Sequence, residues 1–226
     1  MKSHMLVLFL CLFPFVAFNQ MDINQQDDNG KKFGKWEGRW PNGSLRYEGR
    51  FHHDKPVGLF KYYYEDGKLR AVNEFDSDGL KAKHKAYSKS GVLVAEGIYF
   101  DQKKDSVWCI YSDADGVLLA KETYQDNQLN GLTVIYFPGK QQPAEETFFK
   151  NGLRHGKSVK FYDNGSIMSV THFAEDLPDG PFAFYFENGS KQIEGVYRAG
   201  MKTGKWISWD DQGNVLSEES YKDERQ

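Results

Sequence analysis

The sequence predicts an all-β fold, an elongated single-layer antiparallel sheet built from about eight tandem β-hairpins. The first observation behind this prediction is a glycine that recurs at intervals of 24, 24, 25, 23, 26, 24 and 24 residues. These glycines are Gly43, Gly67, Gly91, Gly116, Gly139, Gly165, Gly189 and Gly213. A fixed period in this range is the signature of a repeat architecture. Such a chain is built by stacking similar units, without the single central core of an ordinary domain.

The second observation is a composition that favours strands over helices. The 226 residues include 13 Tyr, 17 Phe and 22 Gly, and this enrichment is typical of short strands joined by tight turns. The net charge is −3 and the charged residues are spread evenly. That balance argues against nucleic acid as a partner.

Three residue classes recur at fixed offsets from the turn glycine. An aromatic residue follows eight positions later, or nine in the longer fifth unit, at Phe51, Phe75, Tyr99, Tyr124, Phe148, Phe173, Tyr197 and Tyr221. An aliphatic residue follows two positions later, at Leu45, Leu69, Leu93, Leu118, Ile167 and Val215. A second, leading glycine precedes by nine positions, at Gly34, Gly58, Gly156, Gly180 and Gly204. This combined recurrence indicates one structural unit repeated along the chain.

The third observation is alternation with a period of two. In the first unit Leu45, Tyr47, Gly49 and Phe51 alternate with polar residues, which predicts a strand with one apolar face. Asn-Gly or Asp-Gly often separates two such runs and supplies the positive φ angles of a tight hairpin turn. The third and fourth units lack the leading glycine and their first strands fit the pattern poorly, so we expect irregular geometry or a bend there.

The two ends of the chain differ from the repeats. Residues 5–18 are almost entirely apolar after a basic start, and the run is too short to span a membrane comfortably. We interpret residues 1–19 as a secretory signal peptide; an uncleaved anchor and lipidation at Cys11 are the alternatives. Residues 20–33 are expected to be a flexible polar lead-in, residues 34–221 the repeat domain, and residues 222–226 a charged tail. Without the signal, Cys109 has no partner for an internal disulfide.

Several units share the order of leading Gly, aromatic, turn Gly, Leu, Glu-Gly and a final aromatic. Gly34–Phe51, Gly58–Phe75, Gly180–Tyr197 and Gly204–Tyr221 follow it most closely. This order resembles the MORN repeat in the bacterial variant that occurs in the YwqK family of toxin–antitoxin antitoxins. The resemblance implies a protein- or lipid-contacting scaffold with no catalytic centre of its own. It also adds an intracellular antitoxin as an alternative function.

A second set of aromatic residues stands four positions before the turn glycine. It comprises Tyr63, Tyr87, Phe161, Tyr185 and Trp209. Their parity places them on the face opposite Trp36 and Phe60, so we select them as candidate partner-binding residues. Ordered aromatic rings can stack on peptides, sugars or lipid headgroups. The alternative is that these rings only shield the backbone and pack across strands.

The other candidate sites are weaker. Glu48, Glu96, Glu194 and Glu218 recur on the polar face and suit cross-strand ion pairs, with a calcium site as the alternative. His52 and His53 lack the converging ligands that a metal needs. We find no catalytic motif and expect neither cofactor nor metal. Paired acids such as Asp113 and Asp115 suit turns; an enzyme using them or Asp105 is the rival interpretation.

These observations together predict a secreted, non-enzymatic scaffold that binds an unidentified protein at the cell envelope. A lipid- or membrane-associated scaffold, or one that associates with polysaccharide, is the first alternative, although few Lys or Arg residues cluster for anionic lipid. The last strand and the residues after it carry many charges, which protect an open sheet end from further pairing. We therefore expect a monomer.

Overall fold

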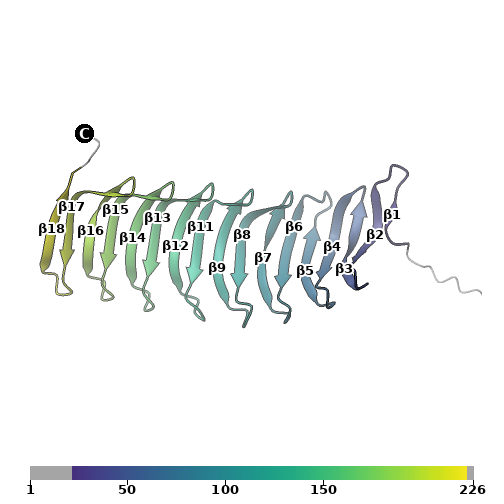
Figure 1. Ribbon diagram of the computed structural model, residues 1–226, viewed down its shortest axis with the longest axis horizontal. Helices are drawn as coiled ribbons and strands as arrows, with labels where there is room; N and C mark the ends of the chain where they lie inside the picture. Colours follow the sequence, from purple (N-terminus) through teal and green to yellow (C-terminus); the bar gives the residue numbers. More distant parts are fainter. Residues whose placement is uncertain (1–21, 223–226) are drawn as a thin grey trace, which may run out of the picture.

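The computed structural model describes residues 22–222, which form one long antiparallel sheet of strands without helices (Figure 1). Its strands are β1 (Gln25–Gln26), β2 (Lys32–Arg39), β3 (Leu45–His52), β4 (Lys55–Tyr63), β5 (Leu69–Phe75), β6 (Lys81–Tyr87), β7 (Leu93–Phe100), β8 (Lys103–Tyr111), β9 (Leu118–Gln125), β10 (Gln128–Leu129), β11 (Gly131–Tyr136), β12 (Pro143–Lys150), β13 (Leu153–Phe161), β14 (Ile167–Ala174), β15 (Leu177–Tyr185), β16 (Lys191–Arg198), β17 (Met201–Trp209) and β18 (Val215–Tyr221).

Each unit is one hairpin that pairs with the hairpins before and after it. β2 pairs with β3, β3 with β4, and the pattern continues through β17 with β18. In the fifth unit the first strand is split at Asn130 into β10 and β11, and both pieces pair with β9. Figure 1 shows the strands side by side along the long axis, with β1 and β18 at opposite ends. The predicted single-layer repeat sheet is confirmed.

The turn inside each unit depends on the recurring glycine. In the first unit the amide of Gly43 donates to the carbonyl of Trp40, and the amide of Trp40 donates to the carbonyl of Ser44. Gly43 has a φ of +86°, as in a hairpin whose type I turn ends on a left-handed residue. Asn42 keeps a negative φ and contributes instead through its side-chain oxygen, which accepts the amide of Ser44 at 2.9 Å.

The turns between units are of a different type. Except in the loop between β5 and β6, they contain two consecutive residues with positive φ, which is the requirement of a two-residue type I′ turn. These pairs are His53 and Asp54, Asp101 and Gln102, Asp126 and Asn127, Asn151 and Gly152, Glu175 and Asp176, and Ala199 and Gly200. Asn, Asp and Gly tolerate this conformation best, and each of the six pairs contains at least one of them.

The leading glycine produces a bulge between neighbouring units. Glu48 pairs with Lys61 and Arg50 pairs with Val57, so Gly49 faces the three residues from Gly58 to Phe60. Gly58 has a φ of +65°, which glycine adopts without steric cost. In the fourth unit Ser106 takes the same place with a φ of +60° and the bulge persists. The expectation of irregular geometry was therefore wrong for the fourth unit.

The third unit does depart from the pattern, but in its loop. β5 and β6 pair without any register shift, and Ala82 stands where the leading glycine would be. Phe51 and Pro56 enclose four residues, whereas the equivalent pair Phe75 and Ala82 encloses six. The two residues that other units insert as a bulge are placed here in the connecting loop. Consequently the strand itself is regular and the unit keeps its length.

One face of the sheet carries a ladder of aromatic rings. Phe51 contacts Trp36 and Phe60 edge-on, with ring centroids 5.8 and 5.1 Å apart, a preferred geometry for aromatic pairs. Similar contacts join His84, Tyr99 and Trp108, and then Phe182, Tyr197, Trp206 and Tyr221. Trp108 and Trp206 are 2% and 4% exposed, so this ladder is the core of the sheet.

Glycines in the second strands make room for these rings. A Cβ at Gly49 would overlap the ring of Phe60, one at Gly97 the ring of Trp108, and one at Gly195 the ring of Trp206. Each ring therefore lies directly on the backbone of the neighbouring strand. The ladder is interrupted in the fifth and sixth units, where small polar residues are buried instead. They are Thr133, Thr147, Ser158 and Ser169.

Register corrects two sequence assignments. Leu45 pairs with Arg39 while Tyr47 pairs with Gly38, so a bulge separates them and Leu45 lies on the face opposite Tyr47. The same shift follows each intra-unit turn. In the fifth unit Gly131 pairs with Phe149, which makes Phe149 the equivalent of Phe51. Phe148 is 48% exposed and belongs to the other face.

The described part of the lead-in pairs with the first strand of the repeat sheet. β1 pairs with the edge of β2, Asn24 donates its backbone amide to the carbonyl of Lys35, and its side-chain oxygen accepts the amide of Glu37. Residues 22–31 therefore cover the first edge of the sheet. The predicted signal peptide and most of the charged tail lie outside the described residues.

We expect Gly195→Ala to destabilise the protein by roughly 1–3 kcal/mol, because the new methyl group overpacks against Trp206. The free energy of unfolding, measured by urea titration followed by circular dichroism, gives this value. The matched background is Trp206→Ala, in which the same glycine substitution should cost much less. An equal cost in both backgrounds would show that ring stacking does not explain this glycine.

Candidate functional site

The five candidate aromatic residues form one row along the face opposite the ladder. Tyr63, Tyr87, Phe161, Tyr185 and Trp209 are the last residues of β4, β6, β13, β15 and β17. Register adds Tyr111 and Tyr136, the last residues of β8 and β11. Sequence counting missed these two because their turns differ in length, which moves them relative to the turn glycine. We call these seven residues the outer row.

Aliphatic side chains lie between the members of the outer row. Tyr63 pairs with Leu69, Tyr87 with Leu93, Phe161 with Ile167 and Trp209 with Val215. Paired residues in an antiparallel sheet share a face. The aliphatic residue two positions after the turn glycine therefore completes this row. Ile167 and Val215 are 41% and 55% exposed.

The rings of the row are half-buried and held in place. Tyr63 donates its hydroxyl to Glu48 at 2.7 Å, and Tyr111 donates to Glu96 at 2.6 Å. Burial, with a further contribution from Glu48, raises the pKa of Tyr63 to about 12. The hydroxyl of Tyr63 is therefore a neutral donor at physiological pH.

Backbone carbonyls of the row also join successive units. The carbonyl of Tyr63 accepts the indole N–H of Trp40, and that of Tyr87 accepts the hydroxyl of Tyr64 at 2.8 Å. Tyr162 donates to the carbonyl of Tyr185 in the same way at 2.7 Å. These bonds align the intra-unit turns, so the spacing of the row is fixed by the repeat.

The glutamates of the polar face form ion pairs. Lys85 lies 3.6 Å from Glu96, Lys191 lies 2.6 Å from Glu194, and Lys205 lies 2.9 Å from Glu218. Across residues 22–222 no cluster of three or more His, Cys, Asp or Glu side chains could hold a metal ion. The pairs of Glu96 and Glu218 are cross-strand, as expected for this face, whereas Lys191 and Glu194 lie on the same strand, β16.

A hollow of about 700 Å³ adjoins the outer row over β13–β17. Its apolar part includes Ile167, Val170, Ala183, Tyr185 and Val196. Its charged part consists of Lys157, Lys191, Lys205 and Glu194. The hollow therefore joins an aromatic member of the row to an aliphatic surface with more positive than negative side chains.

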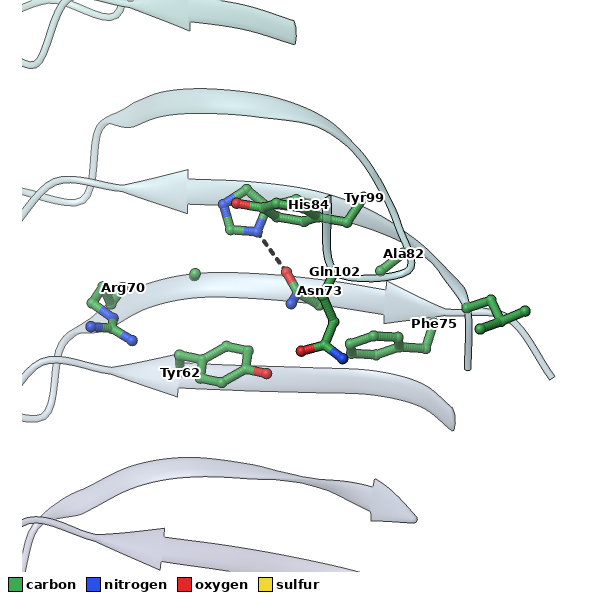
Figure 2. A pocket seen from close by; sticks show the side chains of 10 residues that line it. Tyr62, Arg70, Asn73, Phe75, Ala82, His84, Tyr99 and Gln102 are labelled. Carbon is green, nitrogen blue, oxygen red and sulfur yellow. Dashed lines mark hydrogen bonds between the residues drawn. The ribbon is translucent and has the colours of Figure 1, made fainter. Parts of the chain in front are cut away.

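A second hollow, of about 400 Å³, lies on the ladder face over β4–β6 (Figure 2). It coincides with the unit that lacks the bulge. Figure 2 shows Arg70 toward one end, Tyr62 on one side and His84 on the other. The remaining lining residues are Ala71, Asn73, Phe75, Leu80, Ala82, Tyr99 and Gln102.

His84 and Asn73 are hydrogen-bonded at the centre of this second hollow. The Nδ1 of His84 lies 2.6 Å from the side-chain oxygen of Asn73. That oxygen can only accept, so Nδ1 carries the proton and Nε2 is the free position. Burial, together with the charge of Lys104, lowers the pKa of His84.

Two of the acids proposed for a rival catalytic site, Asp105 and Asp115, accept local hydrogen bonds. Asp115 accepts the amide of Val117 at 3.2 Å within a turn, and Asp105 accepts the hydroxyl of the adjacent Ser106 at 2.8 Å. Cys109 is a free thiol within β8. Residues 22–222 contain no helix of the length and apolarity needed to cross a membrane.

We expect His84 to titrate below its ordinary pKa of 6.5 when followed by NMR. The unfolded chain then takes up this proton at a higher pH than the folded chain does. The free energy of unfolding should therefore fall as the pH drops from about 6.5 toward the folded pKa. In His84→Gln this component of the pH dependence should disappear. A folded pKa at or above 6.5 would contradict the burial of this ring.

Comparisons with known proteins address the repeat alone. The search of curated proteins finds no match. Among solved structures, one match is to a chain of "Crystal Structure of TcdB2-TccC3-Cdc42", with 9% identity and a TM-score of 0.19. The match covers 77% of this chain and 13% of that chain, and at this score it supports no structural argument.

The family comparison identifies the unit itself. The model described as the MORN repeat variant matches residues 56–77, 154–175 and 202–223. Each match begins just before a leading glycine and ends after the final aromatic residue of the second strand. MORN repeats are in general non-catalytic units from which binding scaffolds are built. The chain therefore contains MORN repeats of the variant type.

Proposed function

We propose that this protein is a non-enzymatic scaffold that binds a protein partner along the outer row. The observation that carries the proposal is the continuity of that row. Aromatic residues end seven successive first strands, from Tyr63 to Trp209, and aliphatic residues lie between most of them. Aromatic side chains dominate the energetics of protein interfaces. A row with one position per unit suits a partner that runs along the sheet.

The hollow beside Tyr185 gives this surface a centre. Binding energy in interfaces concentrates where aromatic residues adjoin well-shaped apolar pockets. Here Tyr185, Val170 and Val196 share one hollow with Lys157 and Lys205. The partner we propose therefore presents apolar side chains and at least one acidic group to β13–β17.

The proposed location is the cell envelope. It rests on residues 1–19, whose basic start and short apolar run are typical of a secretory signal. The protein acts there as a monomer in this proposal. Edman sequencing of the chain purified from the native cell tests the processing. A new N-terminus near residue 20 supports export, whereas a cytoplasmic full-length chain favours the antitoxin alternative.

We expect a stoichiometric protein partner to be captured by residues 20–226 from an envelope extract, and to be lost when the row is truncated. The variant combines Tyr63→Ala, Tyr87→Ala, Tyr185→Ala and Trp209→Ala. Loss of two hot-spot residues alone should weaken binding by about 100-fold or more. Capture followed by mass spectrometry identifies the partner, and calorimetry then measures its affinity.

The matched control truncates four exposed apolar residues outside the outer row. Phe100, Phe148, Leu177 and Met201 are 53%, 48%, 51% and 50% exposed, and their replacement by Ala should change the affinity little. Circular dichroism must show both variants folded. Equal loss in the two variants would refute the row as the binding surface. Retention on lipid or polysaccharide without a protein would support the alternative scaffold function.

A further inference from the structure

The hollow in Figure 2 is a gap in the aromatic ladder. Rings contact one another from Trp36 to Phe75, and contact resumes from His84 to Trp108. Between these two runs stand Ala71 and Ala82, which are 8% and 2% exposed. The junction between β5 and β6 has no bulge. Because bulges re-aim side chains, a junction without one places its side chains differently, and no ring contact crosses it among the described residues.

The gap has the width of one further ring. Tyr62 lies on β4 and His84 on β6, on either side of β5 in Figure 2. Two strand spacings separate these strands by about 9–10 Å. A ring that packs at about 3.5–4 Å from each neighbour takes up roughly 7–8 Å of that separation, so one ring fits and a second does not. The methyl group of Ala71 lines the base of the gap, and the hollow, with a volume of about 400 Å³, accommodates a small molecule.

The polar groups of the hollow select a negative charge. Its lining includes Arg70 but no carboxylate. Within residues 22–222 Arg70 makes no ion pair and no hydrogen bond, and it is exposed. Its charge acts on Tyr62, which also interacts with Asn73. Arg70 thus lies toward one end of the gap, on the side of Tyr62 (Figure 2), where a carboxylate can accept hydrogen bonds from its planar guanidinium.

We propose that this hollow is a binding site for a small aromatic carboxylate. The ring of the ligand occupies the missing step of the ladder above Ala71, between Tyr62 and His84. Its carboxylate lies against Arg70, which gains the partner that the protein does not provide. The site lies on the face opposite the outer row, so it is independent of the proposed partner surface.

The polar side chains of the site favour this ligand over a purely apolar one. An apolar molecule would leave the Arg70 guanidinium without a partner, and a carboxylate without a ring would leave the gap above Ala71 unfilled. An aromatic ring that carries a carboxylate both pairs with Arg70 and fills the gap above Ala71. The free Nε2 of His84 and the amide of Gln102 remain available for a second polar substituent.

Phenylacetate is the probe for a direct test on residues 20–226. We expect it to bind with a dissociation constant of about 1 mM, as suits a ligand of this size. The methyl signals of Ala71 and Ala82 and the ring signals of His84 should shift in NMR titration. Acetate, which lacks the ring, and benzyl alcohol, which lacks the charge, should each bind at least about tenfold more weakly.

Arg70→Met removes the charge while keeping a long side chain, and should weaken phenylacetate at least about tenfold. Arg46→Met is the matched control, because Arg46 holds the same place in the first unit and lies over the rings of Trp40 and Tyr47. It should leave binding unchanged. Ala82→Leu fills the hollow and should abolish binding in a protein that circular dichroism shows to be folded.

Three results would overturn the proposal. The first is no NMR shift at Ala71, Ala82 or His84 at ~10 mM phenylacetate, where a site with a dissociation constant of about 1 mM is nearly saturated. The second is equal affinity for phenylacetate and benzyl alcohol. The third is equal weakening of phenylacetate binding by Arg70→Met and Arg46→Met. A protein partner captured through the outer row does not bear on these results. The two proposals can therefore fail separately.

Discussion

The bulge at the leading glycine is the constraint on which the rest of the sheet depends. It places Gly58 in a left-handed conformation and brings Phe60 over Gly49 of the neighbouring strand. The ring of one unit thereby packs on the backbone of another, where a flat hairpin would leave it exposed. Since a single hairpin is marginal in water, this contact between units stabilises the hairpins that make it. The edge-on contact between Phe51 and Phe60 follows from the same placement.

The ladder is not uniform along the sheet, and its interruption has a physical consequence. Thr147 and Ser158 share a hydrogen bond of 2.7 Å. They stand where other units pack a ring on a glycine, as Phe60 packs on Gly49. Thr133 is buried, and its hydroxyl has no partner among the described residues. Buried hydroxyls contribute less than packed aromatic rings and are costly when unpaired. The fifth and sixth units therefore separate two aromatic blocks that each hold together more strongly.

Much of the fold could be predicted from the sequence because the same residue types recur at equivalent positions in several units. The turn glycines, the final aromatic residues and the leading glycines each marked a real feature. Prediction failed where a bulge shifts the strand register or where a turn has a different length. Leu45 shares a pattern of alternation with Tyr47, yet a bulge places them on opposite faces. Tyr111 and Tyr136 were missed because longer or shorter turns moved them relative to the glycine. The hollow at Ala82 could not be predicted from the sequence, because no residue pattern shows that two residues have moved from a strand into a loop.

The bulge-free junction between β5 and β6 also affects the sheet beyond it. Strands in a sheet rotate by roughly 20–25° from one to the next, and each bulge adds to that rotation. The rotation between neighbouring strands adds up along the sheet. A junction that rotates less therefore changes the orientation of every later unit relative to the first. Tyr63 stands before this junction and Tyr185 well after it. A rigid rod laid along the sheet could not meet both at the same angle, whereas a molecule that winds with the sheet, or bends at one point, could.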